Sequence, residues 1–238
     1  KEEARGKQRE WERGPKLTLL NGNERKEDYF DGVILKNMCF LNQGVIFHLD
    51  HGDCFTKNLP EGRLKSLLSG RGKNLTNKVK VISATQCPSS GHVFYYVLFM
   101  DGKAYWDERL GAKVSKFLEE NEIVDCCLGM GWGGGGRCGG ESVLQYVIRS
   151  KKNKMLISLP TCPLGDQKKV FELMAGYDFC SLGLGGGFFV RKGEAMEYSH
   201  LPKSTFRVVR GLEKQKKLKG LYFGPPTNSG SLLLLRHQ

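Results

Sequence analysis

The sequence contains no apolar run that approaches about 18 residues, the length that a membrane-spanning helix needs. Its first residues, KEEARGKQREWERG, mix acids and bases and lack the apolar core of a secretory signal peptide. Their glutamates are also untypical of an organelle transit peptide. We therefore expect no membrane partner and no secretion, and an intracellular location in the cytoplasm, the nucleus or an organelle matrix after processing.

Closely spaced metal ligands are lacking too, since there is no C-x-x-C pair and the adjacent Cys126 and Cys127 would point to opposite faces of a strand. His48, His51 and Cys54 could supply a Cys-His nucleophile, but they fit a hairpin turn and its strands equally well. We expect no metal, no cofactor and no thiol catalysis. The cysteines, mostly inside or beside strand-like runs as is typical of buried thiols in a reducing compartment, are Cys39, Cys54, Cys87, Cys126, Cys127, Cys138, Cys162 and Cys180.

Glycine is abundant in residues 129–142, where Gly129, Gly131 and Gly134 match the pattern G-x-G-x-x-G. A dinucleotide site of that pattern needs a helix directly after the glycines, because the pyrophosphate lies on the helix N-terminus. Here the glycines lead into SVLQYVIR, which is typical of a strand. We therefore expect a loop between two strands, and the same for Gly183 to Gly187.

Residues 93–106, VFYYVLFMDGKAYW, give the strongest local signal in the chain. Asp101-Gly102 is typical of a two-residue type I′ turn, which needs positive φ at both central positions. The run before it is apolar at odd and even positions alike, so both faces of that strand must be covered. We predict a hairpin whose first strand is packed between two layers.

The same pattern recurs along the chain as strand, loop, strand, tight turn, strand and short helix. The copies align on Leu59-Pro60, Arg109-Leu110, Leu159-Pro160 and Leu201-Pro202, with Leu-to-Leu spacings of 51, 49 and 42 residues. Proline suits the first position of a helix, which explains why a helix follows Leu-Pro. In the second copy, the spacing of Val114, Phe117 and Leu118 predicts a helix around AKVSKFLEE. Repeats of about 40 to 50 residues are typical of propeller blades and other repeat arrays.

The fifth copy holds only two strands. KLTLL at 16–20 is a strand without a copy of its own, and NGNERKED after it is expected to form a turn and a polar loop. As the third strand of the fifth copy, KLTLL would close a ring. We predict a mainly β fold with one short helix per repeat, arranged as a propeller-like ring of about five blades. An open array of β-repeats and two smaller α+β domains are the alternatives. The expected division is a polar extension at 1–15 and one repeat domain at 16–238, with copies at about 29–78, 79–122, 123–176, 177–217 and 218–238 plus 16–20.

In period and hairpin pattern, residues 16–238 resemble β-propeller repeat proteins. The Gly-His and Trp-Asp signature of WD40 repeats is missing, because Trp106-Asp107 occurs once and the other copies have Phe55-Thr56, Leu156-Ile157 and Glu197-Tyr198. One helix per repeat also departs from the usual four-stranded blade. The resemblance therefore implies a fold and no functional residue.

The net charge of +12 is unevenly placed, because residues 63–80 and 203–219 each carry a net charge of +6. Segregated charge favours contact with a polyanion or an acidic partner, although solvated helix faces give the same composition. In a closed ring we expect both segments to share one sector of the rim. The candidate contact residues are Arg63, Lys65, Arg71, Lys73, Lys203, Arg207, Arg210, Lys214, Lys216, Lys217 and Lys219.

No RNP, KH or zinc-finger pattern accompanies these charges. No copy carries a distinct set of acid, base, nucleophile or ligand residues, so we predict no catalytic residues and no enzyme. The expected function is a scaffold or complex subunit that binds an acidic protein surface, or a larger complex, through a basic rim. The alternatives are an RNA-binding or ribonucleoprotein component, and an enzyme whose residues converge in a central channel from separate repeats.

Overall fold

The computed structural model describes residues 16–21, 24–29, 35–42, 44–69, 78–132, 142–160, 167–183, 186–199, 201, 203–227 and 230–237. Its strands form five antiparallel sheets. Sheets 1 to 4 follow one another along the chain and hold three strands each. They are sheet 1 with β3 (Leu35–Phe40), β4 (Val45–Leu49) and β5 (Cys54–Lys57), sheet 2 with β6 (Val79–Gln86), β7 (Val93–Phe99) and β8 (Ala104–Trp106), sheet 3 with β9 (Ile123–Trp132), β10 (Ser142–Ser150) and β11 (Met155–Ser158), and sheet 4 with β12 (Phe179–Leu182), β13 (Phe188–Lys192) and β14 (Ala195–Ser199).

Sheet 5 joins the two ends of the chain. It consists of β15 (Leu218–Thr227), β16 (Gly230–His237), β1 (Lys16–Asn21) and β2 (Glu24–Tyr29), in that order. The predicted pairing of residues 16–20 with the fifth copy is confirmed, because β1 lies antiparallel to β16. The stretch that forms β2 was expected to be a polar loop and is an edge strand. A charged edge strand has no apolar alternation by which the sequence could reveal it.

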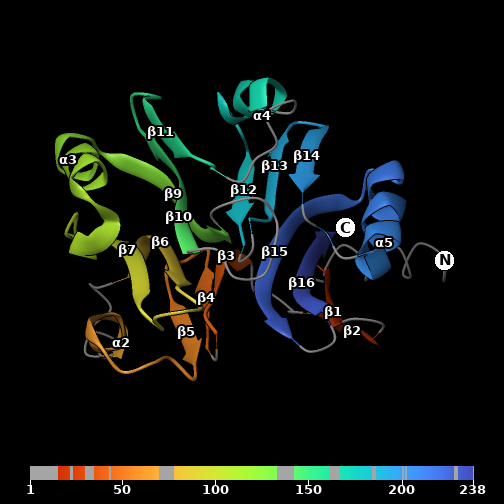
Figure 1. Ribbon diagram of the computed structural model, residues 1–238, viewed down its shortest axis with the longest axis horizontal. Coiled ribbons are helices and arrows are strands. Elements are labelled where there is room, and N and C mark those ends of the chain that lie inside the picture. The colour runs from red at the N-terminus through yellow and green to blue at the C-terminus, as the bar shows by residue number, and fades with distance from the viewer. Residues whose placement is uncertain are drawn as a thin grey trace, which may run out of the picture.

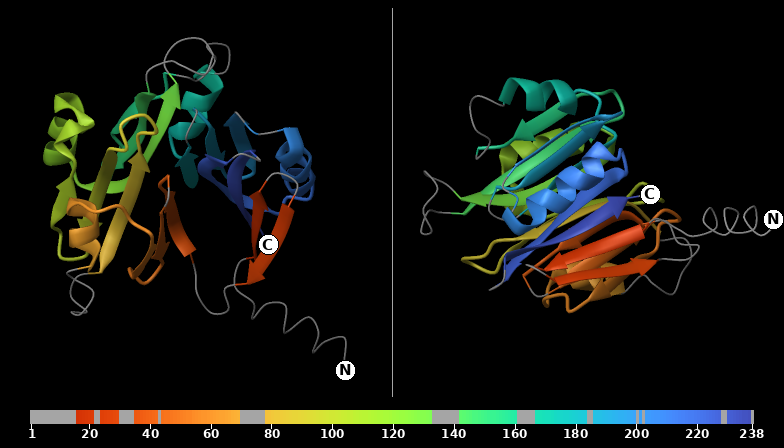
Figure 2. Two further views of the ribbon diagram at one scale, coloured as in Figure 1. Left: turned by 60° about the horizontal axis from the view of Figure 1, so that its bottom comes forward. Right: turned by 90° about the vertical axis from the view of Figure 1, so that its right-hand side faces the viewer.

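The first strand of each sheet lies at the centre of the molecule. β3 contacts β6, β6 contacts β9, β9 contacts β12, β12 contacts β15, and β15 contacts β3. The sheets spread outward from these strands (Figure 1), and the N-terminal strands lie beside the last strands of the chain (Figure 2). The mainly β character that the sequence predicts is confirmed.

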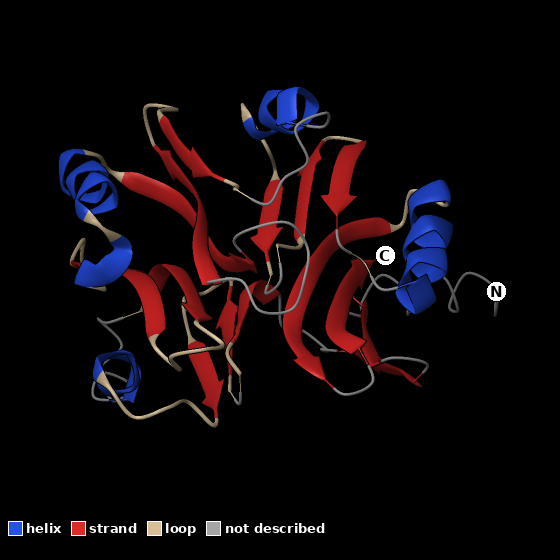
Figure 3. Cartoon of the chain, viewed as in Figure 1, coloured by secondary structure: helices blue, strands red, loops and turns tan. Residues whose placement is uncertain are grey.

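The helices lie at the periphery (Figure 3). They are α2 (Arg63–Ser69), α3 (Ala112–Glu120), α4 (Gln167–Met174) and α5 (Lys203–Lys214), with a 3₁₀ turn, η2 (Glu108–Leu110), before α3. One helix follows each of sheets 1 to 4, and among the described residues none follows sheet 5. A helix in every repeat, as expected from the sequence, is therefore not found.

The apolar core consists of clusters between neighbouring sheets. β7 shows why, because Tyr95, Val97 and Phe99 pack toward sheet 1 and α2, whereas Tyr96 and Leu98 pack toward sheet 3 and α3. The prediction that this strand is covered on both faces is confirmed. Burial of both faces stabilises the fold by about 25 cal/mol for each Å² of apolar surface that is removed from water.

The turn after β7 differs from the expected type I′ turn. Gly102 has φ of +85°, but Asp101 is not among the described residues with positive φ. The Phe99 N–H donates to the Lys103 carbonyl at 2.9 Å, and the Lys103 N–H donates to Asp101 Oδ1 at 3.0 Å. The loop is therefore longer than two residues and needs the left-handed region only at the glycine.

Candidate functional site

α2 carries few of the basic residues that were predicted to bind a partner. Arg63 and Lys65 lie on this helix, whereas Arg71 and Lys73 lie outside the described residues. Arg63 is exposed, and Lys65 forms an ion pair with Glu61, four residues earlier. Because that pair partly neutralises the helix, α2 by itself is a weak anchor for a polyanion.

α5 carries a basic stripe. Lys203, Arg207, Arg210 and Lys214 are spaced by four, three and four residues, which places them on one face of an α-helix. Arg207, Arg210 and Lys214 are exposed. We call these four residues the basic stripe.

The cations after the stripe are less uniform. Lys217 is exposed, whereas Lys219 is half-buried on β15. Lys216 Nζ pairs with Glu194 Oε2 at 2.9 Å, and this contact lowers the pKa of the Glu194 carboxyl. These three lysines therefore do not extend the stripe as a continuous free surface.

The two basic segments lie on different sides of the molecule. Leu64 of α2 packs between sheets 1 and 2, whereas Val209 of α5 packs between sheets 4 and 5. Figure 1 shows the two helices on opposite sides. The expectation that both segments share one sector is wrong, because each helix packs between its own sheet and the next sheet along the chain.

An aromatic side chain lies next to the basic stripe. Phe206 is 38% exposed, and the Arg210 guanidinium lies over its ring at 5.0 Å. The Tyr198 ring of β14 meets Phe206 at 6.3 Å, and its hydroxyl donates to Glu213 Oε2 at 2.8 Å. Arg210 and Phe206 are thus ordered before a partner binds, which reduces the entropy cost of binding.

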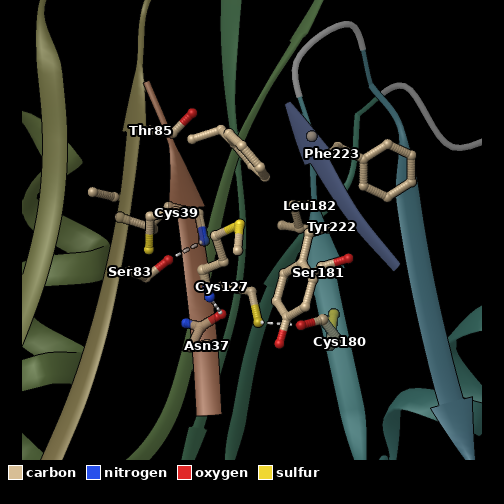
Figure 4. Close-up of a pocket in the computed structure, with 15 residues that line it drawn as sticks. Asn37, Cys39, Ser83, Thr85, Cys127, Cys180, Ser181, Leu182, Tyr222 and Phe223 are labelled. Atoms are coloured by element: carbon tan, nitrogen blue, oxygen red, sulfur yellow. Dashed lines mark hydrogen bonds between the residues drawn. The ribbon is translucent and has the colours of Figure 1, made fainter. Parts of the chain in front are cut away.

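The central cavity lies between the first strands and has a volume of about 30 Å³ (Figure 4). Its polar groups bond from one sheet to the next, and so they hold the sheets together and leave little capacity for a ligand. In order round the centre, these bonds are Asn37 Nδ2 to Ile82 O (2.7 Å), Leu128 N to Ser83 Oγ (2.8 Å), Cys127 Sγ to Cys180 O (3.2 Å) and Ser181 Oγ to Leu221 O.

A second cavity lies near the beginnings of the first strands and has a volume of about 220 Å³. It shares Asn37 and Cys180 with the central cavity. Several of its lining residues are exposed, so it opens to solvent. We call it the charged cavity, because its ionisable residues come from four sheets: Lys36 and His48 from sheet 1, Lys80 from sheet 2, Asp125 and Arg149 from sheet 3, and Asp178 next to sheet 4.

β-Bulges place the lysines of the charged cavity. The pairing of β3 with β4 skips Lys36, and the pairing of β6 with β7 skips Lys80. The pairing of β9 with β10 skips Val124, which is likewise the second residue of its strand. A bulge changes the direction of a side chain, and bulges are frequent next to functional sites. Lys36 reaches sheet 2, where its Nζ donates to the Lys80 carbonyl at 2.6 Å.

Asp125 is a carboxyl whose charged form is disfavoured. Burial raises its pKa above the ordinary value, and the Tyr177 hydroxyl and the Arg149 charge oppose this effect without cancelling it. The Cys126 N–H donates to Asp125 Oδ1 at 2.9 Å. A carboxyl with a raised pKa protonates readily, and it can then donate a hydrogen bond into the cavity.

Arg149 holds an unused hydrogen-bond donor. Its Nη1 donates to the Tyr177 carbonyl at 2.8 Å, and its guanidinium lies over the Tyr177 ring at 4.3 Å. Its Nε is buried without a partner, and the Tyr177 hydroxyl, although near Asp125, makes no hydrogen bond of normal geometry. A buried donor left unpaired costs about 1–3 kcal/mol, so an acceptor at this place would be stabilising.

His48, His51 and Cys54 do not form a nucleophilic pair. His48 is buried and its Nε2 lies 2.9 Å from the Val79 carbonyl, so it donates there; burial lowers its pKa to about 4. Burial raises the pKa of the Cys54 thiol to about 12, which keeps it protonated. His51 Nε2 lies 2.8 Å from Asp53 Oδ2. Both histidines therefore have other partners, and the Cys54 thiol stays protonated.

Cys87 is the thiol that departs from this pattern. Burial raises its pKa, but hydrogen bonds with Ser89 and Ser90 outweigh that effect and lower the pKa to about 6. His92, which is close in the chain, is held by Asp107 with Nε2 3.1 Å from Oδ2. Within the described residues no histidine is positioned as a base for Cys87, and so it is not assigned a catalytic role.

The glycines of the G-x-G-x-x-G match belong mainly to a strand. Gly129 and Gly131 lie in β9 and pair with β10, and Gly134 lies outside the described residues. A Cβ on Gly129 would lie 2.5 Å from the Cβ of Leu182, so this glycine lets β9 and β12 approach closely. The expected loop therefore begins later than predicted, and β9 supplies no helix N-terminus for a phosphate.

The described part of the chain contains no group of three His, Cys, Asp or Glu side chains that could hold a metal ion. In the same residues, no helix is both long and apolar enough to cross a membrane.

Sequence reasoning missed the charged cavity, because its residues come from four separate repeats. A signal does exist in the sequence. An apolar residue followed by lysine begins three of the five first strands, as Leu35-Lys36, Val79-Lys80 and Leu218-Lys219. Aligning the repeats on their first strands would have placed these lysines at one end of the structure.

The chain matches no model of a known protein family and no curated protein.

Proposed function

We propose that this chain is a non-enzymatic interaction module, a propeller-like ring of five sheets whose basic stripe on α5 binds an acidic protein segment. The cyclic contacts of the first strands and the pairing of β1 with β16 support the ring. The observation that carries the function is the alignment of Lys203, Arg207, Arg210 and Lys214 on one helix face.

The dimensions of the stripe suit a short acidic peptide. Lys203 and Lys214 are eleven residues apart, which corresponds to about 16 Å along an α-helix. About five residues of an extended chain have the same length. Phe206, partly exposed beside the cations, adds apolar contact area of the kind that anchors protein interfaces. An extended acidic segment with one apolar residue fits this surface in both charge and length.

RNA fits the stripe less well. Because α2 lies on the other side of the molecule, a single RNA strand at α5 would gain only about four phosphate contacts. Four contacts predict an affinity for single strands that falls roughly 50-fold between about 50 and 200 mM salt. Such binding would be weak at physiological salt, and so the protein partner is the one that we propose.

A charge-reversal pair tests the assignment. Arg207→Glu combined with Lys214→Glu should abolish binding of a fluorescent poly-glutamate peptide, measured by anisotropy at about 50 mM salt. The matched control, Lys113→Glu with Lys116→Glu on the exposed face of α3, should bind the peptide as the unmodified chain does. Arg210 is left unchanged because it packs on Phe206.

Single- and double-stranded RNA serve as competing probes. If RNA binds more tightly than the peptide, and the α5 variant loses that binding, the partner is RNA and not an acidic protein segment. Equal effects of the α5 and α3 variants, or no binding of any probe at low salt, would show that the stripe is an ordinary solvated helix face.

A further inference from the structure

The charged cavity has no part in the interaction assigned to α5. It lies at the beginnings of the first strands, whereas α5 packs at the outer part of the interface between sheets 4 and 5. We propose that the charged cavity binds a small anion, a molecule that carries a carboxylate or phosphate group, with Lys36, Lys80 and Arg149 as its cationic contacts.

The balance of charge in the cavity favours an anion. Three cations line it against two carboxyl groups, Asp125 and Asp178. Asp178 already accepts a hydrogen bond from the Gly193 N–H at 2.6 Å through Oδ2. Asp125 is the carboxyl whose charged form is disfavoured by burial. The cavity therefore presents more uncompensated positive than negative charge.

The donors of the cations remain available. Arg149 Nε is buried and unpartnered. Lys80 Nζ lies 3.7 Å from Glu122, which Lys151 approaches more closely, at 3.1 Å. Lys36 uses one of its three ammonium hydrogens on the Lys80 carbonyl. Lys36 and Lys80 can thus donate charge-assisted hydrogen bonds to an anion, and Arg149, which also lines the cavity, adds its positive charge.

The surroundings of Asp125 suit the same ligand. The groups that act on its carboxyl are Tyr177 from the segment before β12, Arg149 from β10 and Lys36 from β3. An anion placed among these groups would raise the pKa of Asp125 further, and the carboxyl in its protonated form would be a further donor to the ligand.

Inorganic phosphate and citrate are the probes, titrated into the whole chain by calorimetry at constant ionic strength, with chloride as the reference salt. We expect saturable binding of at least one probe with a dissociation constant of roughly 1 mM or below. Arg149→Gln and Lys80→Gln should each weaken it by about 10- to 100-fold, because each removes a cationic contact. Lys113→Gln, the same change at an exposed site on α3, should leave it unchanged.

Two further variants distinguish a failure of the anion site from a failure of the α5 proposal. Asp125→Asn retains a donor and removes the negative charge, so it should bind phosphate at least as tightly as the unmodified chain. The Arg207→Glu and Lys214→Glu chain should also retain full binding, which makes the result independent of the α5 proposal. Saturable binding of neither probe overturns the inference. So does loss of binding in Asp125→Asn while circular dichroism shows a folded chain, or equal weakening by Lys80→Gln and Lys113→Gln.

Discussion

At the scale of single residues, buried polar side chains join neighbouring sheets. His48 is 1% exposed and lies against the Val79 carbonyl, so its imidazole links sheet 1 to sheet 2. Burial lowers the pKa of His48 from 6.5 to about 4, because the charged ring would lose its hydration. The hydrogen bond to the Val79 carbonyl favours the charged ring, but the effect of burial is larger, so the ring stays neutral down to about pH 4.

The stability of the chain should therefore depend on pH through His48. The unfolded chain takes up a proton at this residue below about pH 6.5, whereas the folded chain does so only near pH 4. The contribution is fully present above pH 6.5 and is lost as the pH falls to about 4, by up to about 3 kcal/mol.

The comparison that isolates His48 is with His48→Gln, which keeps a donor for Val79. Urea unfolding between pH 7 and pH 4 should show the unmodified chain losing up to about 3 kcal/mol more than the variant. A difference between the two chains that stays constant over this range would contradict the prediction.

At the scale of elements, β1 has a larger role than its length suggests. It lies between β16 and β2, so it joins the two C-terminal strands of sheet 5 to the other N-terminal strand. Without β1, β16 would present a row of unpaired N–H and C=O groups at an edge. Sheet 5 in turn packs against sheet 1 through Tyr222, Leu35 and Met38.

Deletion of residues 1–22 should therefore destabilise the whole fold, whereas deletion of residues 1–14 leaves β1 in place and should cost much less. Thermal unfolding followed by circular dichroism measures both. The 1–22 deletion should lower the midpoint well below that of the 1–14 deletion. Equal midpoints would show that β1 does not stabilise the last sheet.

At the scale of the whole molecule, none of the apolar clusters among the residues whose burial is described belongs to a single sheet. Each apolar cluster is shared by two neighbouring sheets, and four of the clusters also contain side chains of the helix between those sheets. Because every sheet depends on its neighbours on both sides, the loss of one interface weakens the next. We expect the chain to unfold in one cooperative transition.

Leu64→Ala tests this cooperativity, since it removes a buried side chain of α2 at the interface of sheets 1 and 2. It should lower the free energy of unfolding by about 2–5 kcal/mol. Cys180, buried between sheets 3 and 4, reports on the other side of the molecule. Its thiol should become reactive at the same urea concentration at which the circular dichroism signal is lost. A protected Cys180 after that loss would show that the sheets unfold separately.

The sequence by itself determined the local elements. Two-sided apolar runs such as residues 93–99 indicated strands covered on both faces, and the spacing of Val114, Phe117 and Leu118 indicated α3. Three of the four leucines on which the repeats align, Leu59, Leu110 and Leu159, are buried, whereas Leu201 is half-buried. These features could be predicted because the periodicity of apolar residues is a property of the sequence within one repeat. The edge strand β2 escaped prediction because a strand that faces solvent needs no apolar alternation.

Only the tertiary structure decided which residues meet. Lys36, Lys80 and Asp125 are more than 40 residues apart in sequence, yet the contacts between first strands bring them to one cavity. The same packing separates α2 from α5, although their charges are alike in the sequence. Composition records how many cations a segment holds. The order in which sheets pack against one another determines whether those cations face a common ligand.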